Sequence, residues 1–149
     1  MWSDSKSLKV SKICTILFMA LLLFCLAAAP WLVARLIFIS ASAALAGTTS
    51  FLVTIYVGSI PAAALLVCLY ALLHRIGNGD VFIKTNVSYL RYISWCCFAG
   101  AVIALVSAAF YVPWLFFGVS AAFMGLIIRV VKNVVAEAVT LQDESDLTI

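Results

Sequence analysis

Four long runs of hydrophobic residues follow one another along the chain, and shorter, more polar segments separate them. A helix needs about 20 apolar residues to cross the hydrocarbon core of a bilayer, and a backbone in lipid must satisfy its hydrogen bonds internally. The runs do not alternate as β-barrel strands do. The pattern therefore predicts one membrane domain, an all-α, integral membrane four-helix bundle with spans at about 13–33, 50–73, 92–111 and 113–131.

The segments between the runs differ in character. Residues 34–49 are mostly small and apolar, so they either extend the first span or form an interfacial helix. Residues 74–91 are polar and contain the turn sequence Gly-Asn-Gly-Asp, which predicts a loop. The connection at 111–114 is very short and predicts a tight antiparallel hairpin, with Pro113 in the first turn of the fourth helix, where it removes no needed donor.

The loop carries apolar and capping residues of its own. Val81, Phe82 and Ile83 are poorly suited to free solution, so we expect them to pack on the membrane interface or on another polar segment. Thr85 or Asn86 is expected to accept backbone donors at the start of the third helix.

The tail, residues 132–149, continues the fourth run with a different pattern. Apolar residues at 130, 131, 134, 138 and 141 follow helical spacing, while polar residues fill the other positions. We therefore expect the fourth helix to continue beyond the membrane as an amphipathic helix that ends in an acidic run at 142–146.

Basic residues lie almost entirely on one side of the predicted spans. Only Arg35 falls on the opposite side, and the other eight flank the spans on the first side: Lys6, Lys9, Lys12, Arg75, Lys84, Arg91, Arg129 and Lys132. Lys and Arg are enriched in cytoplasmic loops, so the distribution predicts an N-in/C-in topology. All six acidic residues fall on the same, cytoplasmic side.

Composition excludes a water-soluble domain. Hydrophobic residues make up 66% of the chain and charged residues 10%, against about 45–50% and about 25% in soluble domains. The basic residues before the first run resemble a signal peptide. However, that run is longer than a usual signal core and Pro30 would follow the cleavage point, so we expect an uncleaved first span. The five cysteines lie in apolar runs and are read as small apolar side chains.

The spans offer no catalytic constellation. His74 is the single histidine, and no Asp, Glu or Lys lies inside a span. Nucleophilic catalysis needs a base beside its nucleophile, and ion-coupled carriers usually place ionisable groups inside the membrane. We therefore expect a protein that is not an enzyme and has no cofactor or metal site.

Two features inside the spans concern helix shape and packing. Pro61 removes a helical donor, which predicts a structural bend, with a hinge or ligand site as the sharper interpretation. Small residues recur at four-residue spacing and allow close helix approach in lipid, which favours packing within the hairpin over a homo-oligomer: Gly100, Ala104 and Ala108, Gly118 and Ala122, and Ala121 and Gly125.

Two polar segments carry a family resemblance. The loop G-D-V-F-I-K-T-N-V-S-Y-L-R-Y-I (79–93) and the tail A-E-A-V-T-L-Q-D-E-S-D-L-T-I (136–149) resemble motifs of the domain-of-unknown-function 2975 family of small bacterial four-span membrane proteins. Val81 stands where that family usually has Pro. The resemblance implies the bacterial inner membrane and no known enzyme activity. It also implies genes adjacent to those of small helix-turn-helix proteins.

Together these patterns favour a regulatory or interaction role for a protein embedded in the lipid bilayer. The expected partner is a cytoplasmic helix-turn-helix protein, without direct binding of nucleic acid by this chain. The alternative is a transport or export accessory or an immunity-type membrane protein. The candidate interaction residues are Asp80, Phe82, Asn86, Glu137, Asp143, Glu144, Asp146 and Leu147, and the candidate hinge is Pro61.

Overall fold

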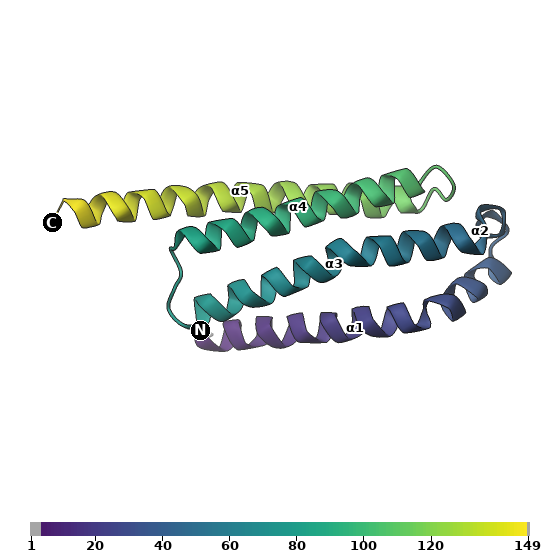
Figure 1. The fold of residues 1–149 in the computed structure, drawn as a ribbon, viewed down its shortest axis with the longest axis horizontal. Coiled ribbons are helices and arrows are strands. Elements are labelled where there is room, and N and C mark those ends of the chain that lie inside the picture. Colours follow the sequence, from purple (N-terminus) through teal and green to yellow (C-terminus); the bar gives the residue numbers. More distant parts are fainter. Residues whose placement is uncertain (1–3, 149) are drawn as a thin grey trace.

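A computed structural model describes residues 4–148 as a bundle of four long helices and one short one (Figure 1). The long helices are α1 (Asp4–Ile39), α3 (Thr48–Gly77), α4 (Lys84–Ser107) and α5 (Trp114–Leu147), and the short one is α2 (Ala41–Ala46). All four long helices are long and apolar enough to cross a membrane. The prediction of an all-α bundle with four apolar helices is therefore confirmed.

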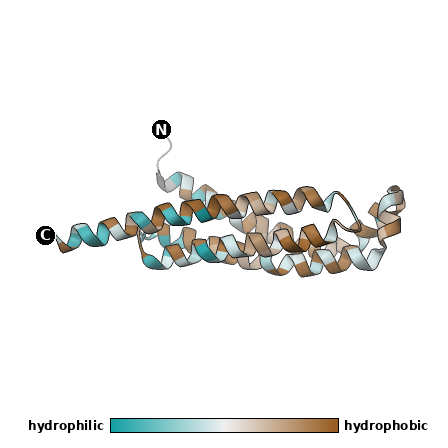
Figure 2. Ribbon diagram, turned by 90° about the horizontal axis from the view of Figure 1, so that it is seen from above, coloured by the Kyte–Doolittle hydropathy of each residue, from teal (hydrophilic) through white to brown (hydrophobic). Residues whose placement is uncertain are grey.

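The long helices pack in chain order. α1 packs on α3, α3 on α4, and α4 on α5. The N-terminal end of α1, the loop 78–83 and the C-terminal part of α5 lie together at one end of the bundle, and α5 projects beyond the start of α4 (Figure 1). We call this the polar end. Figure 2 shows hydrophilic residues concentrated there and hydrophobic residues along the middle of the bundle.

The opposite end holds α2 and the α4–α5 turn, and it contains a small buried core. Phe51 is buried there with Val33 and Ala43. Its ring meets the ring of Tyr111 edge-on, with centroids 5.0 Å apart. Such pairs stabilise beyond simple burial, so this cluster ties α1, α2, α3 and the turn together.

The segments between the long helices begin and end at other residues than the sequence predicts. Residues 34–49 divide between two helices, because α1 extends to Ile39 and α2 follows as a separate short helix. An interfacial position for α2 stays a prediction. Ser40 accepts the backbone N–H of Ala43 at α2's start, 3.4 Å away. Gly47, with φ +79°, then turns the chain into α3.

The polar loop is shorter than 74–91 and the hairpin turn is longer than 111–114. α3 continues to Gly77 and α4 begins at Lys84, which leaves only residues 78–83 between them. α4 ends at Ser107, so the last residues of the apolar run 92–111 belong to the turn. Pro113 directly precedes α5, with helical backbone angles, instead of lying in its first turn.

Candidate functional site

The candidate interaction residues lie at the polar end, where the α4–α5 hairpin brings distant parts of the chain together. α4 and α5 run antiparallel, so a residue on α5 faces the residue on α4 whose number is about 223 minus its own. A Cβ at Gly118 would meet Leu105, and one at Gly125 would meet Cys97. Continuing this register away from the turn brings the start of α4 alongside the tail of α5.

An ion pair joins the loop side to the tail. The Nζ atom of Lys84, the first residue of α4, lies 3.4 Å from a carboxylate oxygen of Asp143 near the end of α5. Both side chains are exposed, so water and salt screen the pair and it stabilises by at most about 1 kcal/mol. The pair is informative about position, because it places the start of α4, which directly follows the loop, next to the tail of α5.

Asn86 has a different role from the expected one. Its side chain is only 2% exposed, and its Nδ2 atom donates to the backbone carbonyls of Asp80 (2.6 Å) and Val81 (2.8 Å). The residue preceding α4 is Ile83, which makes no side-chain cap bond. The expectation that Asn86 accepts donors as a cap is therefore wrong, since its amide closes the loop as a donor. Asn86 is thus covered in the free chain, and its role as an interaction residue stays a prediction.

The remaining candidate residues of the loop and tail are exposed. Asp80 and Phe82 project from the loop, and Phe82 keeps 51% of its surface accessible. On α5 the exposed residues are Glu137, Asp143, Glu144, Asp146 and Leu147. No basic residue follows Lys132 in the sequence, so the last part of α5 carries four negative charges and no positive one. Acidic and apolar side chains therefore share one accessible surface.

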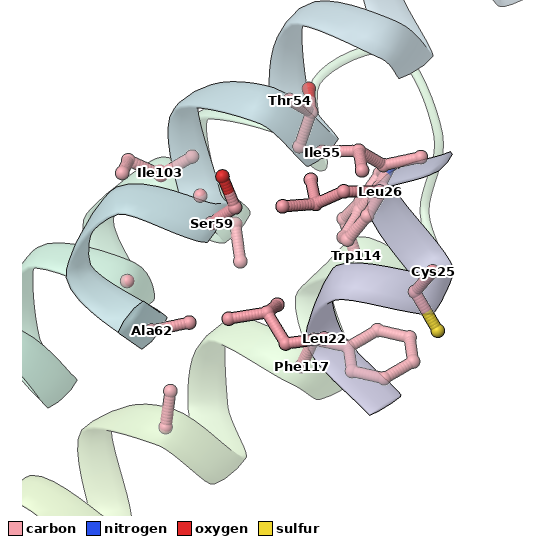
Figure 3. Close-up of a pocket in the computed structure, with 14 residues that line it drawn as sticks. Leu22, Cys25, Leu26, Thr54, Ile55, Ser59, Ala62, Ile103, Trp114 and Phe117 are labelled. Atoms are coloured by element: carbon pink, nitrogen blue, oxygen red, sulfur yellow. The ribbon is translucent and has the colours of Figure 1, made fainter. Parts of the chain in front are cut away.

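The middle of the bundle contains an apolar cavity of about 380 Å³ (Figure 3). Side chains of α1, α3, α4 and α5 line it, including Leu22, Thr54, Ser59 and Phe117. Its hydroxyls are already bonded: Thr54 Oγ1 lies 2.8 Å from Ser107 Oγ, and Ser59 Oγ donates to the Tyr56 carbonyl at 2.6 Å. The cavity is suited to an apolar group.

Pro61 lies inside α3, one residue from Ala62 in the cavity wall. α3 remains one continuous helix from Thr48 to Gly77 and changes direction near its middle (Figure 1). This direction change fits the bend expected from a missing donor and a displaced carbonyl. A hinge role for Pro61 stays a prediction.

Sequence reasoning missed one group of residues at the polar end. Arg91, Arg129 and Lys132 were expected only to orient the chain, but all three line a small pocket between α4 and α5. A sequence signal exists, since residues 91 and 132 lie at similar distances on either side of the expected turn 111–114. Among the side chains of residues 6–148, no group of three His, Cys, Asp or Glu residues is arranged to hold a metal ion.

The four long helices identify the class of protein to which this chain belongs. Four apolar helices of spanning length, joined by short connections, make this chain a multi-pass membrane protein. The family model described as "Protein of unknown function (DUF2975)" matches residues 8–149. The chain therefore belongs to this family, which confirms the resemblance carried by the loop and the tail. Comparison with curated proteins and with solved structures found no match.

Proposed function

We propose that this protein is a non-enzymatic, membrane-embedded docking protein whose polar end binds a basic cytoplasmic protein. The observation that carries the proposal is the tail of α5, which projects beyond the start of α4 (Figure 1). It exposes four acidic side chains with no basic residue after Lys132.

The length of α5 supports a tail outside lipid. Its 34 residues span about 51 Å at about 1.5 Å per residue, whereas a hydrocarbon core is about 30 Å thick. Charged side chains in the last turns are costly in lipid. On this proposal the tail is an amphipathic extension in the cytoplasm, and both termini face the cytoplasm of a bacterial inner membrane.

The surface offers two complementary kinds of contact. Exposed carboxylates attract a basic partner and accelerate encounter. Exposed apolar side chains beside them then supply contact area, and Leu147 is the most accessible at 86%. A small helix-turn-helix protein, the partner expected from the sequence resemblance, has the basic surface that DNA binding requires. Holding such a protein at the membrane would regulate its access to DNA.

The test uses purified proteins. The full chain in mild detergent is immobilised, and a small helix-turn-helix protein from the same bacterium is passed over it. We expect binding by the natural chain and at least a tenfold loss in the neutralised variant Glu137→Gln/Asp143→Asn/Glu144→Gln/Asp146→Asn. The matched control, Glu137→Asp/Asp143→Glu/Glu144→Asp/Asp146→Glu, keeps the charge and should bind like the natural chain. Equal binding by the neutralised variant, or no binding at all, would contradict the proposal.

A second function is favoured by the cavity alone. An apolar cavity of about 380 Å³ beside Pro61 fits a transport or export accessory, or an immunity-type protein that binds a membrane-active molecule. The two functions are distinguished by complementation. A flux or resistance defect in a deletion strain that is restored by a protein carrying the neutralised tail would favour this second function.

A further inference from the structure

A small pocket between α4 and α5 is lined by three cationic side chains. Its volume is about 50 Å³, and its walls are Arg91, Ser94, Trp95, Arg129 and Lys132. One water needs roughly 10–15 Å³ of such space, so the pocket admits a group of only a few heavy atoms. That size suits a single phosphate.

The helix register places one of these cations at the contact between the helices. Gly118, Gly125 and Val139 are the buried residues of α5, and each lies seven or fourteen residues from the next. Lys132 lies midway between Gly125 and Val139, on the same side of the helix, and is half-buried. By the same register it faces Arg91 on α4. The two cations thus lie on facing stretches of α4 and α5 and both line the pocket, with Lys132 half-buried and Arg91 exposed.

The cations have no acidic partner in the described part of the chain. Among the side chains of residues 6–148, the one salt bridge joins Lys84 to Asp143. The Arg129 guanidinium instead lies over the Trp95 ring, 5.9 Å from its centroid. The Ser94 hydroxyl is also used, since it donates to the Gly125 carbonyl at 3.0 Å. Positive charge thus converges on a pocket that lacks a counter-charge.

The surroundings indicate where a counter-charge would come from. Tyr92 and Trp95 beside the pocket are exposed aromatic residues, which are typical of the membrane–water interface. Leu126, almost one helical turn before Arg129 on α5 and so nearer the middle of the bundle, is an exposed apolar residue. Arg and Lys bind phosphate oxygens by charge-assisted hydrogen bonds, and basic pockets between membrane helices bind lipid headgroups.

We propose that this pocket binds the phosphate of an anionic phospholipid, with the acyl chains lying along the apolar face of α5. The lipid supplies the missing negative charge between α4 and α5. It thereby stabilises the hairpin that carries the tail. This inference does not depend on the proposed docking function, because docking uses the acidic residues of the tail, whereas the pocket is lined by Arg91, Arg129 and Lys132.

The test measures lipid binding to the full chain in neutral detergent by native mass spectrometry. Three ligands are compared: phosphatidylglycerol, phosphatidylcholine and inorganic phosphate. We expect one tightly held phosphatidylglycerol, at least tenfold weaker binding of phosphatidylcholine, and no retained inorganic phosphate. Arg129→Gln/Lys132→Gln should weaken phosphatidylglycerol binding at least tenfold. The matched control Lys6→Gln/Lys9→Gln removes the same charge from exposed positions on α1 and should leave it unchanged.

A second variant tests the charge argument without measuring binding. Lys132→Met removes the half-buried one of the three positive charges at the pocket, so its melting temperature in neutral lipid should exceed that of the natural chain. In phosphatidylglycerol the natural chain should gain stability and the variant should gain less. Equal phosphatidylglycerol binding by Arg129→Gln/Lys132→Gln, retention of inorganic phosphate alone, or an equal lipid-dependent gain in Lys132→Met would each overturn the proposal.

Discussion

Asn86 is the residue whose role the structure changes most. Asn near the beginning of a helix usually favours a cap, and nothing local distinguishes that role from the observed one. The observed role depends on the loop folding back, so that two carbonyls from 80 and 81 reach the Asn86 amide. A contact of this kind is set by the path of the loop, which a residue type alone does not encode.

Replacing Asn86 with Ala should destabilise the loop. The substitution removes two hydrogen bonds to the Asp80 and Val81 carbonyls, each of which stabilises by about 0.5–1.5 kcal/mol. We expect a lower melting temperature in detergent and faster proteolysis within 78–83. Ser88→Ala is the control, because the exposed Ser88 hydroxyl makes only a local bond at 3.4 Å. A melting temperature equal to the control's would show that the amide is not needed.

At the scale of elements, the sequence predicts helices better than it predicts their ends. An apolar run shows which residues are suited to a lipid environment, whereas a helix ends where its backbone hydrogen bonds stop. α4 therefore ends at Ser107 within an apolar run, and α5 continues through a charged segment to Leu147. The hairpin was predictable because the segment between the last two runs is too short for any other connection.

The glycines of the hairpin give a paired prediction about helix packing. A Cβ at Gly118 would lie 2.7 Å from Leu105 Cγ and 3.1 Å from the Leu105 backbone nitrogen, whereas one at Gly100 meets nothing within 4 Å. Gly118→Ala should therefore cost about 1–3 kcal/mol through overpacking, and Gly100→Ala should be neutral or stabilising. Thermal unfolding of both variants in one detergent measures the difference. Equal destabilisation would contradict the close α4–α5 contact.

At the scale of the whole molecule, charged and hydrophobic residues are separated along the bundle axis. Most charged residues gather at the end that holds both described termini, and the middle is hydrophobic (Figure 2). This separation was readable from the sequence, because it needs only the order of apolar runs and charges. The Lys84–Asp143 contact and the cationic pocket depend in addition on the exact α4–α5 register, which brings together residues 34 or more positions apart.

The orientation of the bundle gives the last prediction. Eight basic residues lie on the polar-end side of the spans and Arg35 alone lies toward the other end, and such a bias places the basic side in the cytoplasm. Single cysteines are introduced at Asp80 or at Thr49, both exposed, in a chain whose natural cysteines are replaced by Ala. A membrane-impermeant maleimide should label Thr49→Cys in spheroplasts and label Asp80→Cys only after lysis.

The reverse labelling pattern would have a specific consequence. It would place the acidic tail outside the cytoplasm, beyond reach of any DNA-binding protein, and the docking proposal would fail. The cationic pocket would remain, because anionic phospholipids can occur in either leaflet and the charges of Arg91, Arg129 and Lys132 need a counter-charge on either side. Orientation therefore separates the two proposals: one requires the polar end in the cytoplasm, and the other requires only a bilayer that contains anionic lipid.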